Sequence, residues 1–223
     1  RAERLLATSQ SAVLLLQLEI SVEVMRGLVE KCAKRCPVAL KASPPQCAAS
    51  AHRVLEVGVG LCFLNEATAP SLLGWAPLPL ITPADAERAA VEALEKWPSL
   101  CTVVVTCPTG HVLVERRSGG WRNPHPSEAE GAQVGAVRSV VVPRGQRNVV
   151  DPVGAADAFI GGFIAAQAWG LPLAESLLCA SAAGDIAASR EGAYAPNDGE
   201  LLDELCAQLV PVVKSRPLSL VRT

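Results

Sequence analysis

Short apolar runs of strand length constrain the fold of this chain more than any other feature. They cover residues 12–18 (AVLLLQL), 61–64 (LCFL) and 102–106 (TVVVT). Such runs are typical of strands that are buried on both faces, as in a parallel sheet. Segments with helical periodicity separate them. Alternating strands and helices predict an α/β fold, arranged as a three-layer α/β/α sandwich around a mostly parallel central sheet.

The segments between these runs carry helix signals. Residues 21–36 place apolar side chains at helical spacing, and Pro37 ends the pattern. Residues 82–97 begin with Thr-Pro-Ala-Asp, which predicts a capping box with proline at the first helical position. Further helices are expected over residues 48–57, 173–189 and 199–210, and from a first turn that includes Asp157 to Trp169. Strands are expected over residues 38–40, 112–116 and 137–142, with a turn at 109–110. Irregular chain is expected over residues 70–83, 118–135 and the C-terminal tail.

Composition narrows the class of protein. A chain of 223 residues that is half hydrophobic can bury one sizeable core, so a single domain over residues 1–223 is predicted. The net charge of −2 gives no electrostatic case for a nucleic-acid or membrane partner. No run is long enough to span a membrane and no signal peptide is visible, so we expect a cytoplasmic protein. Because the chain begins with Arg1, we expect a processed product or a fragment.

Eight cysteines do not form a recognisable metal or disulfide pattern. No CxxC pair is present, and the three histidines are scattered. Several cysteines lie inside apolar runs, as Cys62 and Cys179 do. They are therefore predicted to be small core residues of a reduced, intracellular protein.

The stretch Asp151–Phe159 (DPVGAADAF) is the strongest functional candidate. Gly154 predicts a turn, and the following helix has no charged side chain from Ala158 to Trp169, so we expect it to be buried on nearly all sides. Asp157 falls in the first turn, where N–H groups and the positive end of the helix dipole collect. Small residues there let an anion approach the backbone. The stretch predicts a phosphate cradle with a general base, although an aspartate in this position can also be a simple cap.

Four segments, in order and in spacing, carry a resemblance to a known family. DPVGAADAFIGGF resembles the signature of the ribokinase/PfkB carbohydrate kinases, and LLLQLEI (residues 14–20), FLNEATA (63–69) and ASREGA (188–193) resemble three further family blocks. The resemblance is nearest to the ribokinases. It covers nearly the whole chain but only the C-terminal two-thirds of a family member, the nucleotide-binding and catalytic part. The N-terminal sugar-binding and lid segment is unmatched.

The resemblance implies transfer of the γ-phosphoryl group of ATP to a primary hydroxyl of a sugar, with D-ribose as the expected substrate. It implies Mg²⁺ and, in the ribokinases, K⁺ as cofactors, and it is compatible with a homodimer. Asp157 would be the base that takes the hydroxyl proton. The backbone after Gly154, from Ala155 through Ala156 to Asp157, would form the anion hole. Positioning and charge stabilisation of this kind supply most of the catalysis in phosphoryl transfer.

Other site residues follow from the resemblance by position. Glu19 matches a sugar contact, and a short loop over residues 106–111 matches the nucleotide loop. The implied nucleotide-binding residues are Asn65, Thr106, Gly110, His111, Ala156, Ser181 and Gly192. The implied monovalent-cation ligands are Asp151, Val153, Ala187, Arg190 and Gly192. Since Asn65, Thr106 and Asp151 each follow a predicted strand, we expect them to meet at the carboxyl edge of the sheet.

Each of these residues also has a simpler interpretation. Asn65 can be a turn residue, Glu19 a solvated flank and Thr106 the end of a strand, while Ser181 can be a helix-surface or back-bonded hydroxyl.

The sequence departs from the family pattern near the expected chemistry. Pro152 replaces the signature threonine, Ala156 the glycine before the catalytic aspartate, and Thr68 the glutamate of the NxxE motif. Pro108 occupies the position of a glycine in the nucleotide loop, and Pro196 occupies that of a serine in the cation site. Two hypotheses therefore stand: an ATP-dependent sugar kinase, or a catalytically impaired or non-catalytic member that keeps the fold and weak nucleotide binding.

Overall fold

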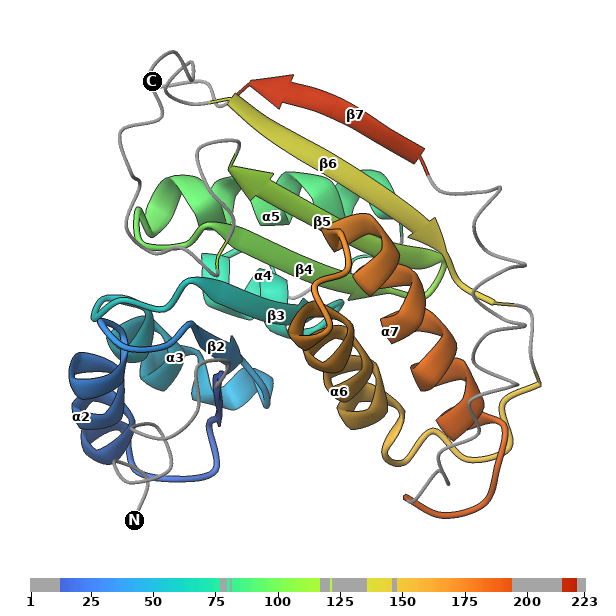
Figure 1. The fold of residues 1–223 in the computed structure, drawn as a ribbon, viewed down its shortest axis with the longest axis horizontal. Coiled ribbons are helices and arrows are strands. Elements are labelled where there is room, and N and C mark those ends of the chain that lie inside the picture. The colour runs from blue at the N-terminus through green and yellow to red at the C-terminus, as the bar shows by residue number, and fades with distance from the viewer. Residues whose placement is uncertain are drawn as a thin grey trace. The chain divides into compact units, whose positions relative to one another are not determined.

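The strands of the chain form one sheet in which they follow each other in sequence order (Figure 1). The computed structural model describes residues 13–76, 80, 82–116, 121, 136–145 and 148–193, and the backbone of 214–219. Within these residues the strands are β1 (Leu14–Gln17), β2 (Val38–Lys41), β3 (Leu61–Asn65), β4 (Thr102–Cys107), β5 (Gly110–Arg116), β6 (Ala136–Pro143) and β7 (Lys214–Ser219).

The first four strands run parallel in register, as the apolar runs predicted. Leu16 lies opposite Leu40, and Phe63 lies opposite Val104. Side chains on both faces of β4 are buried, since the neighbouring residues Val103 and Val104 are both fully inaccessible. β1 departs from the expectation of two buried faces, because Leu15 is 37% exposed. β5 reverses the chain after β4 through a two-residue turn, which the sequence placed one residue too late. The predicted turn residue Gly110 already belongs to β5.

Helices connect the parallel strands. They are α2 (Val22–Cys32), α3 (Ala48–Leu55), α4 (Thr68–Leu73) and α5 (Pro83–Lys96), with a 3₁₀ turn, η1 (Pro45–Cys47). The predicted capping box of α5 is present: the Thr82 side chain accepts from the N–H of Asp85, whose carboxylate accepts from the N–H of Thr82. α2 ends four residues before the predicted Cys36.

The expectation of irregular chain over residues 70–83 was partly wrong, because α4 includes Pro70–Leu73. Pro70 lies in the first turn of α4, where a missing N–H removes no helical hydrogen bond. Ala69 and Leu72 are buried, and α4 packs on β3 and α5. Tertiary burial therefore stabilises a helix that local propensity did not predict.

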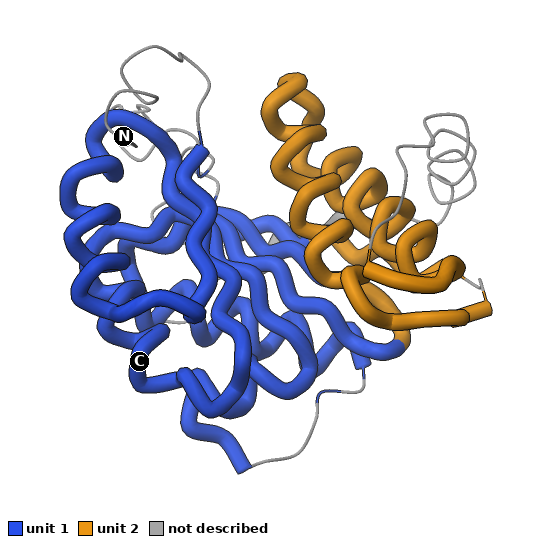
Figure 2. The backbone as a smooth tube through the Cα atoms, turned by 90° about the horizontal axis from the view of Figure 1, so that it is seen from below, with its two compact units in different colours: residues 1–108, 112–139, 215–223 blue, residues 109–111, 140–214 orange. Residues whose placement is uncertain are grey.

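The chain clusters into two compact units, coloured separately in Figure 2. The first comprises residues 1–108, 112–139 and 215–223, and the second comprises residues 109–111 and 140–214. The single domain expected from the sequence stays a prediction. The second unit contains most of the predicted site residues, together with two helices, α6 (Ala155–Ala168) and α7 (Leu173–Ala188).

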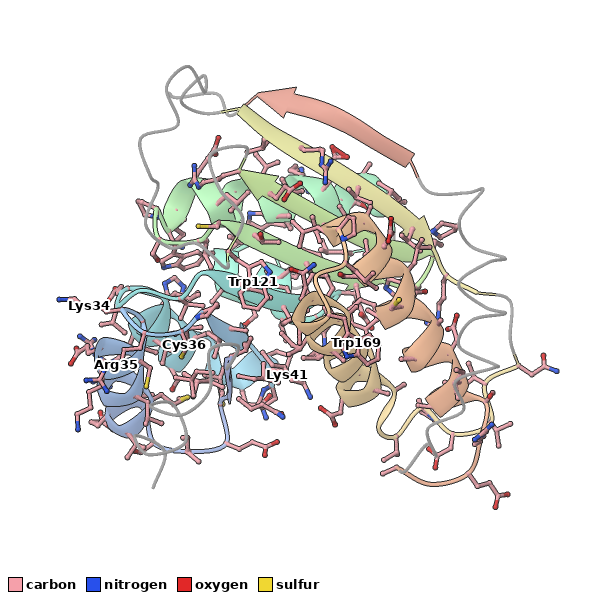
Figure 3. The ribbon with its side chains drawn as sticks, in the orientation of Figure 1. Lys34, Arg35, Cys36, Lys41, Trp121 and Trp169 are labelled. Carbon is pink, nitrogen blue, oxygen red and sulfur yellow. The ribbon has the colours of Figure 1, made fainter. Side chains whose placement is uncertain are left out.

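Small residues bring α6 and α7 together. A Cβ on Gly162 would lie 2.9 Å from the Cβ of Ala183, and a Cβ on Gly184 would lie 3.4 Å from that of Phe159. α6 is not buried on nearly all sides, which corrects the expectation. Phe159 and Phe163 are buried, but Gly161 is exposed and Trp169, just after the helix, is 76% exposed (Figure 3). An uncharged sequence thus did not imply burial of every face.

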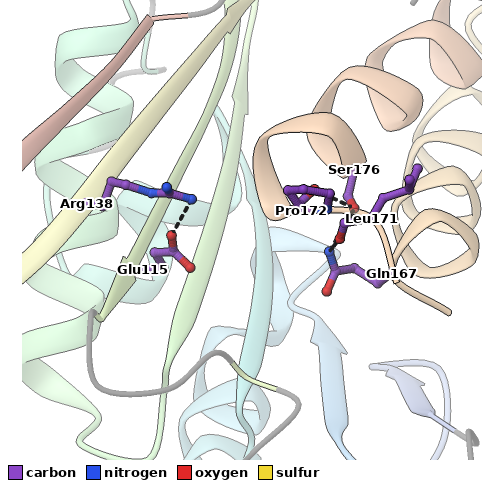
Figure 4. A network of polar contacts seen from close by, with 6 residues as sticks. All are labelled: Glu115, Arg138, Gln167, Leu171, Pro172 and Ser176. Atoms are coloured by element: carbon purple, nitrogen blue, oxygen red, sulfur yellow. Dashed lines mark hydrogen bonds and ion pairs between the residues drawn. The ribbon is translucent and has the colours of Figure 1, made fainter. Parts of the chain in front are cut away.

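A polar network closes the turn between α6 and α7 (Figure 4). The Gln167 side-chain amide donates to the Leu171 carbonyl at 2.8 Å and to the Ser176 hydroxyl at 2.7 Å, and that hydroxyl donates to the Pro172 carbonyl at 3.0 Å. Figure 4 also shows an ion pair of the first unit, in which Arg138 contacts Glu115 at 2.7 Å. The pKa of the Glu115 carboxyl is raised, because the effect of its burial exceeds the opposing effect of the Arg138 charge.

The remaining expectations had mixed outcomes. The C-terminal tail contains β7, so the expectation of an irregular tail was wrong. The predicted helix over 199–210 and most of the predicted loop over 118–135 lie outside the described residues. Within the described part of the chain, Cys32, Cys36, Cys62 and Cys107 are buried as predicted, whereas Cys179, also expected in the core, is only half-buried. The described cysteines form no disulfide. No described helix is long and apolar enough to cross a membrane.

Candidate active site

The N-terminus of α6 is the centre of the candidate site. Gly154 caps the helix with φ +82°, a left-handed conformation that favours glycine. α6 begins at Ala155, so Asp157 is its third residue and lies in the first turn, as predicted. The Asp157 residue is exposed, and the N–H groups of this turn point out of the helix end. The Ala155 N–H also donates to the Pro152 carbonyl at 3.2 Å, so a ligand would have to share that donor.

The turn before α6 lies against the segment that follows α7. A Cβ on Gly154 would lie 2.5 Å from the carbonyl oxygen of Ala193 and 3.0 Å from its Cα. These are backbone atoms and cannot rotate away as a flexible side chain can. Gly154 is therefore required both by its φ angle and by this close approach.

The Asp151 carboxylate bridges the same two segments. One oxygen accepts from the N–H of Val153 at 2.9 Å, and the other accepts from the N–H of Gly192 at 3.0 Å. The N–H groups of Val150 and Asp151 in turn donate to the carbonyl of Ala188 at 2.8 and 3.1 Å. Residues 150–154 and 188–193 are thus joined by several hydrogen bonds within the second unit.

The residues predicted as monovalent-cation ligands gather in this region. Asp151 and Gly192 are hydrogen-bonded to each other, and Val153 lies two residues beyond Asp151. Ala187 lies in the last turn of α7, where its carbonyl accepts a hydrogen bond from the N–H of Arg190 at 3.3 Å. A carboxylate and main-chain carbonyls are oxygen donors, and each oxygen has a second lone pair beyond the hydrogen bond it accepts. The donor set is chemically suited to a hard monovalent cation.

In the first unit, Asn65 and Thr106 lie side by side, as predicted. They are register partners at the carboxyl ends of β3 and β4. Asn65 also shapes its own turn: its side-chain oxygen accepts from the N–H groups of Ala67 and Thr68 at 3.0 and 2.8 Å, and the Thr68 hydroxyl accepts from the Asn65 N–H at 2.8 Å. The expectation that Asp151 meets them stays a prediction. Glu19 is exposed in a turn just after β1.

The predicted nucleotide loop at residues 106–111 is a tight hairpin turn between β4 and β5. Gly110 and His111 are buried at the start of β5. The His111 ring contacts the Phe159 ring with centroids 4.8 Å apart. Burial, with a smaller contribution from the Arg144 charge, lowers the pKa of His111 to about 3, so the imidazole is neutral at pH 7.

Ser181 is neither a surface hydroxyl nor a back-bonded one. Its residue is 1% exposed on α7, and its oxygen has no hydrogen-bond partner among the described residues. Leaving a buried hydroxyl without a partner costs about 1–3 kcal/mol, so such a group requires an explanation. A ligand contact, as the family resemblance implies, would provide one.

Asp185 contacts the backbone next to the predicted nucleotide loop, and it was not among the residues predicted from the sequence. It is 8% exposed on α7, and its carboxylate accepts from the N–H of Gly145 at 3.1 Å. A Cβ on Gly145 would collide with this carboxylate. The preceding residue, Arg144, donates its N–H to the carbonyl of Thr109, in the predicted nucleotide loop. The available signal was a single charged residue in the otherwise uncharged helical stretch from Ser176 to Ser189.

Comparison with known proteins decides the family. The profile of the pfkB family carbohydrate kinases matches residues 3–199. The chain belongs to the PfkB family of carbohydrate kinases. The resemblance read from the four sequence segments is thereby confirmed.

Solved structures of this family share the fold. Phosphofructokinase-2 from Escherichia coli in complex with potassium is 20% identical with a TM-score of 0.69, and the match covers 93% of this chain and 60% of that one. Ribokinase from Arabidopsis thaliana complexed with ribose and ATP is 21% identical with a TM-score of 0.62, covering 87% and 55%. The chain therefore spans about 60% or less of the length of these relatives. The predicted ribokinase-like α/β fold with a mostly parallel sheet is confirmed.

Proposed function

We propose that this PfkB family member phosphorylates a sugar hydroxyl with ATP. One observation carries the proposal: the exposed carboxylate of Asp157 lies in the first turn of α6, behind the left-handed Gly154. A carboxylate there can accept the proton of an attacking hydroxyl. The outward N–H groups of Ala156 and Asp157 can stabilise the charge on the transferring phosphoryl group. The N–H of Ala155 can contribute as well, although it is shared with the Pro152 carbonyl.

The remaining site residues have proposed binding roles. Glu19 would contact the sugar, and Asn65, Thr106, Gly110, His111, Ser181 and Gly192 would line the nucleotide site. The orphan hydroxyl of Ser181 supports a ligand contact. Burial of His111 supports a backbone contact there more than a contact through its ring. The carboxylate of Glu66, the residue after Asn65, offers the oxygen ligands that Mg²⁺ prefers, whereas the Asn65 side-chain oxygen already accepts two N–H groups. When bound, Mg²⁺ would neutralise charge on the ATP phosphates.

We favour D-ribose, converted to ribose 5-phosphate, as the substrate. The ribokinase-like segments support this choice, and a ribokinase complexed with ribose is among the structures of the same fold. Phosphofructokinase-2 in complex with fructose-6-phosphate, 20% identical with a TM-score of 0.66 over 93% of this chain and 59% of that one, supports a phosphorylated hexose instead. K⁺ at Asp151, Val153, Ala187, Arg190 and Gly192, a homodimer and a cytoplasmic location belong to the same proposal.

A non-catalytic role is the second candidate, and a specific observation favours it. Thr68 occupies the position of the NxxE glutamate, and its hydroxyl is engaged with the backbone of Asn65. It therefore does not replace the carboxylate that the family uses near Mg²⁺. Ala156 also adds a methyl group where the family has glycine. Both changes would weaken turnover more than nucleotide binding.

Calorimetry with ATP and Mg²⁺, combined with ribose-dependent release of ADP, separates the two candidates. We expect the wild-type chain to bind ATP, and Asp157→Asn to keep that binding while losing at least about a hundredfold in turnover, because a general base contributes about 10²–10⁴-fold. Asp85→Asn is the matched control, because Asp85 is also an exposed first-turn aspartate, in α5. It should leave turnover unchanged.

Two outcomes would contradict the kinase proposal. Absence of ATP binding at millimolar concentration would exclude it for this chain. Nucleotide binding without turnover, unchanged by Asp157→Asn, would favour the non-catalytic role. Replacing ribose by fructose 6-phosphate in the same assay decides between the two proposed sugars.

A further inference from the structure

Asp151 holds together the two segments that meet at the N-terminus of α6. Its two carboxylate oxygens accept one N–H each, from Val153 at 2.9 Å and from Gly192 at 3.0 Å. Val153 is on the catalytic side, immediately before the capping Gly154, whereas Gly192 belongs to the segment after α7. A single side chain therefore links the approach to α6 with residues 188–193.

Three neighbouring contacts limit the directions in which the turn before α6 can move. Residues 150 and 151 donate their N–H groups to the Ala188 carbonyl, which fixes where the chain leaves α7. Gly154 is packed against the backbone of Ala193, so the turn cannot move toward the segment after α7. Gly184 on α7 completes the frame, since a Cβ there would lie 3.3 Å from the Ala155 carbonyl in the first turn of α6.

The remaining freedom of this turn is movement away from residues 188–193, and the Asp151 carboxylate opposes that movement. Hydrogen bonds to an ionised carboxylate are stronger than those between neutral groups. Both acceptors must be present at once, because the N–H of Val153 and the N–H of Gly192 reach different oxygens. An aspartate satisfies this requirement, and an asparagine with one acceptor oxygen does not.

We propose that Asp151 is a positioning residue that fixes the first turn of α6, and with it Ala156 and Asp157, relative to residues 188–193. Its consequence for catalysis rests on the proposed kinase function, but its geometry does not. Asp151 contacts neither of the proposed reacting groups and acts through Val153, Gly154 and Gly192. This role differs from cation binding, because it depends on the N–H donors that the carboxylate accepts.

The test compares Asp151→Asn with Glu191→Gln in the full chain by ¹H–¹⁵N NMR. Glu191 is the matched control, since it is an exposed carboxylate next to Gly192 and its neutralisation also removes one negative charge from the two joined segments. Asp151→Asn should speed amide hydrogen exchange at Val153 or Gly192 by at least about tenfold, because one N–H loses its acceptor. The amide resonances of Ala156 and Asp157 should shift more in Asp151→Asn than in Glu191→Gln.

A kinetic readout distinguishes positioning from a general loss of structure. With K⁺ held constant, Asp151→Asn should lower kcat by at least about tenfold while the Kd for ATP stays within about threefold, because the catalytic turn moves and the rest of the nucleotide site does not. Glu191→Gln should leave both values unchanged. A tenfold fall in kcat accompanied by an equal rise in Kd would overturn the assignment.

The amide measurements decide the proposal independently of activity. Unchanged exchange at both Val153 and Gly192 would show that the carboxylate does not hold them. Shifts at Ala156 and Asp157 no larger than those in Glu191→Gln would show that it does not position the first turn. If the wild-type chain binds no ATP, the kinase function fails while these two amide readouts still confirm or overturn the role of Asp151.

Discussion

Replacement of Gly154 by alanine tests the backbone geometry on which the candidate site depends. Gly154 has φ +82°, and an L-residue in the left-handed region costs about 1–2 kcal/mol. The new Cβ would in addition lie 2.5 Å from the Ala193 carbonyl oxygen, so the two segments must separate. Forcing an extra methyl group into packed surroundings costs a further ~1–3 kcal/mol. We therefore expect Gly154→Ala to lower the free energy of unfolding by about 2–5 kcal/mol.

Gly170 provides a matched control within the same unit. Its φ is +84°, almost that of Gly154, but a Cβ there would meet no atom within 4 Å. Gly170→Ala should therefore cost only the conformational part, about 1–2 kcal/mol. Urea unfolding of the two variants isolates the effect of close packing, since a change in midpoint without a change in slope reports stability. Equal destabilisation by both substitutions would refute the close approach of Gly154 to Ala193.

Two further predictions concern buried side chains of each unit. His111 is neutral and buried with its pKa lowered to about 3, so below pH 6.5 the unfolded state binds a proton more readily than the folded state. Relative to His111→Leu, the wild-type chain should therefore lose about 2 kcal/mol of its free energy of unfolding between pH 7 and pH 5, as measured by urea titrations. A parallel pH dependence of the two proteins would contradict this. Trp121 is 1% exposed, and its ring N–H has no partner among the described residues. Trp121→Ala should cost about 3–5 kcal/mol and Trp121→Phe clearly less; similar unfolding midpoints for the two variants would show that ring volume is not what matters.

Strand and helix identity could largely be predicted from local sequence. The apolar runs predicted buried parallel strands because side chains on both faces must be apolar there. β1 to β4 confirm the parallel pairing, and β3 and β4 confirm the burial, whereas β1 leaves Leu15 exposed. The capping box at Thr82 and Asp85 was predicted because its donors and acceptors are all local. Elements that depend on distant contacts were not: α4 is stabilised by burial, and β7 lies in what was expected to be a tail.

The candidate site divides in the same way. Family motifs placed Asp157 and Gly154 at a helix start, and parallel register placed Asn65 beside Thr106, because these relations follow from order along the chain. Sequence could not show that Gly154 touches Ala193, or that the Asp151 carboxylate accepts from Gly192, 41 residues away. It also could not show that Asp185 accepts from Gly145.

The sequence by itself therefore determined the fold class, the family and the identity of the candidate base. Patterning, capping and signature residues act over a few positions, so they can be read without coordinates. The tertiary structure decided which polar groups hold the first turn of α6 in place and which side chains are buried, as for His111 and Ser181. Those properties arise when α6, α7 and the segments flanking them pack together, and no local stretch of sequence encodes that packing.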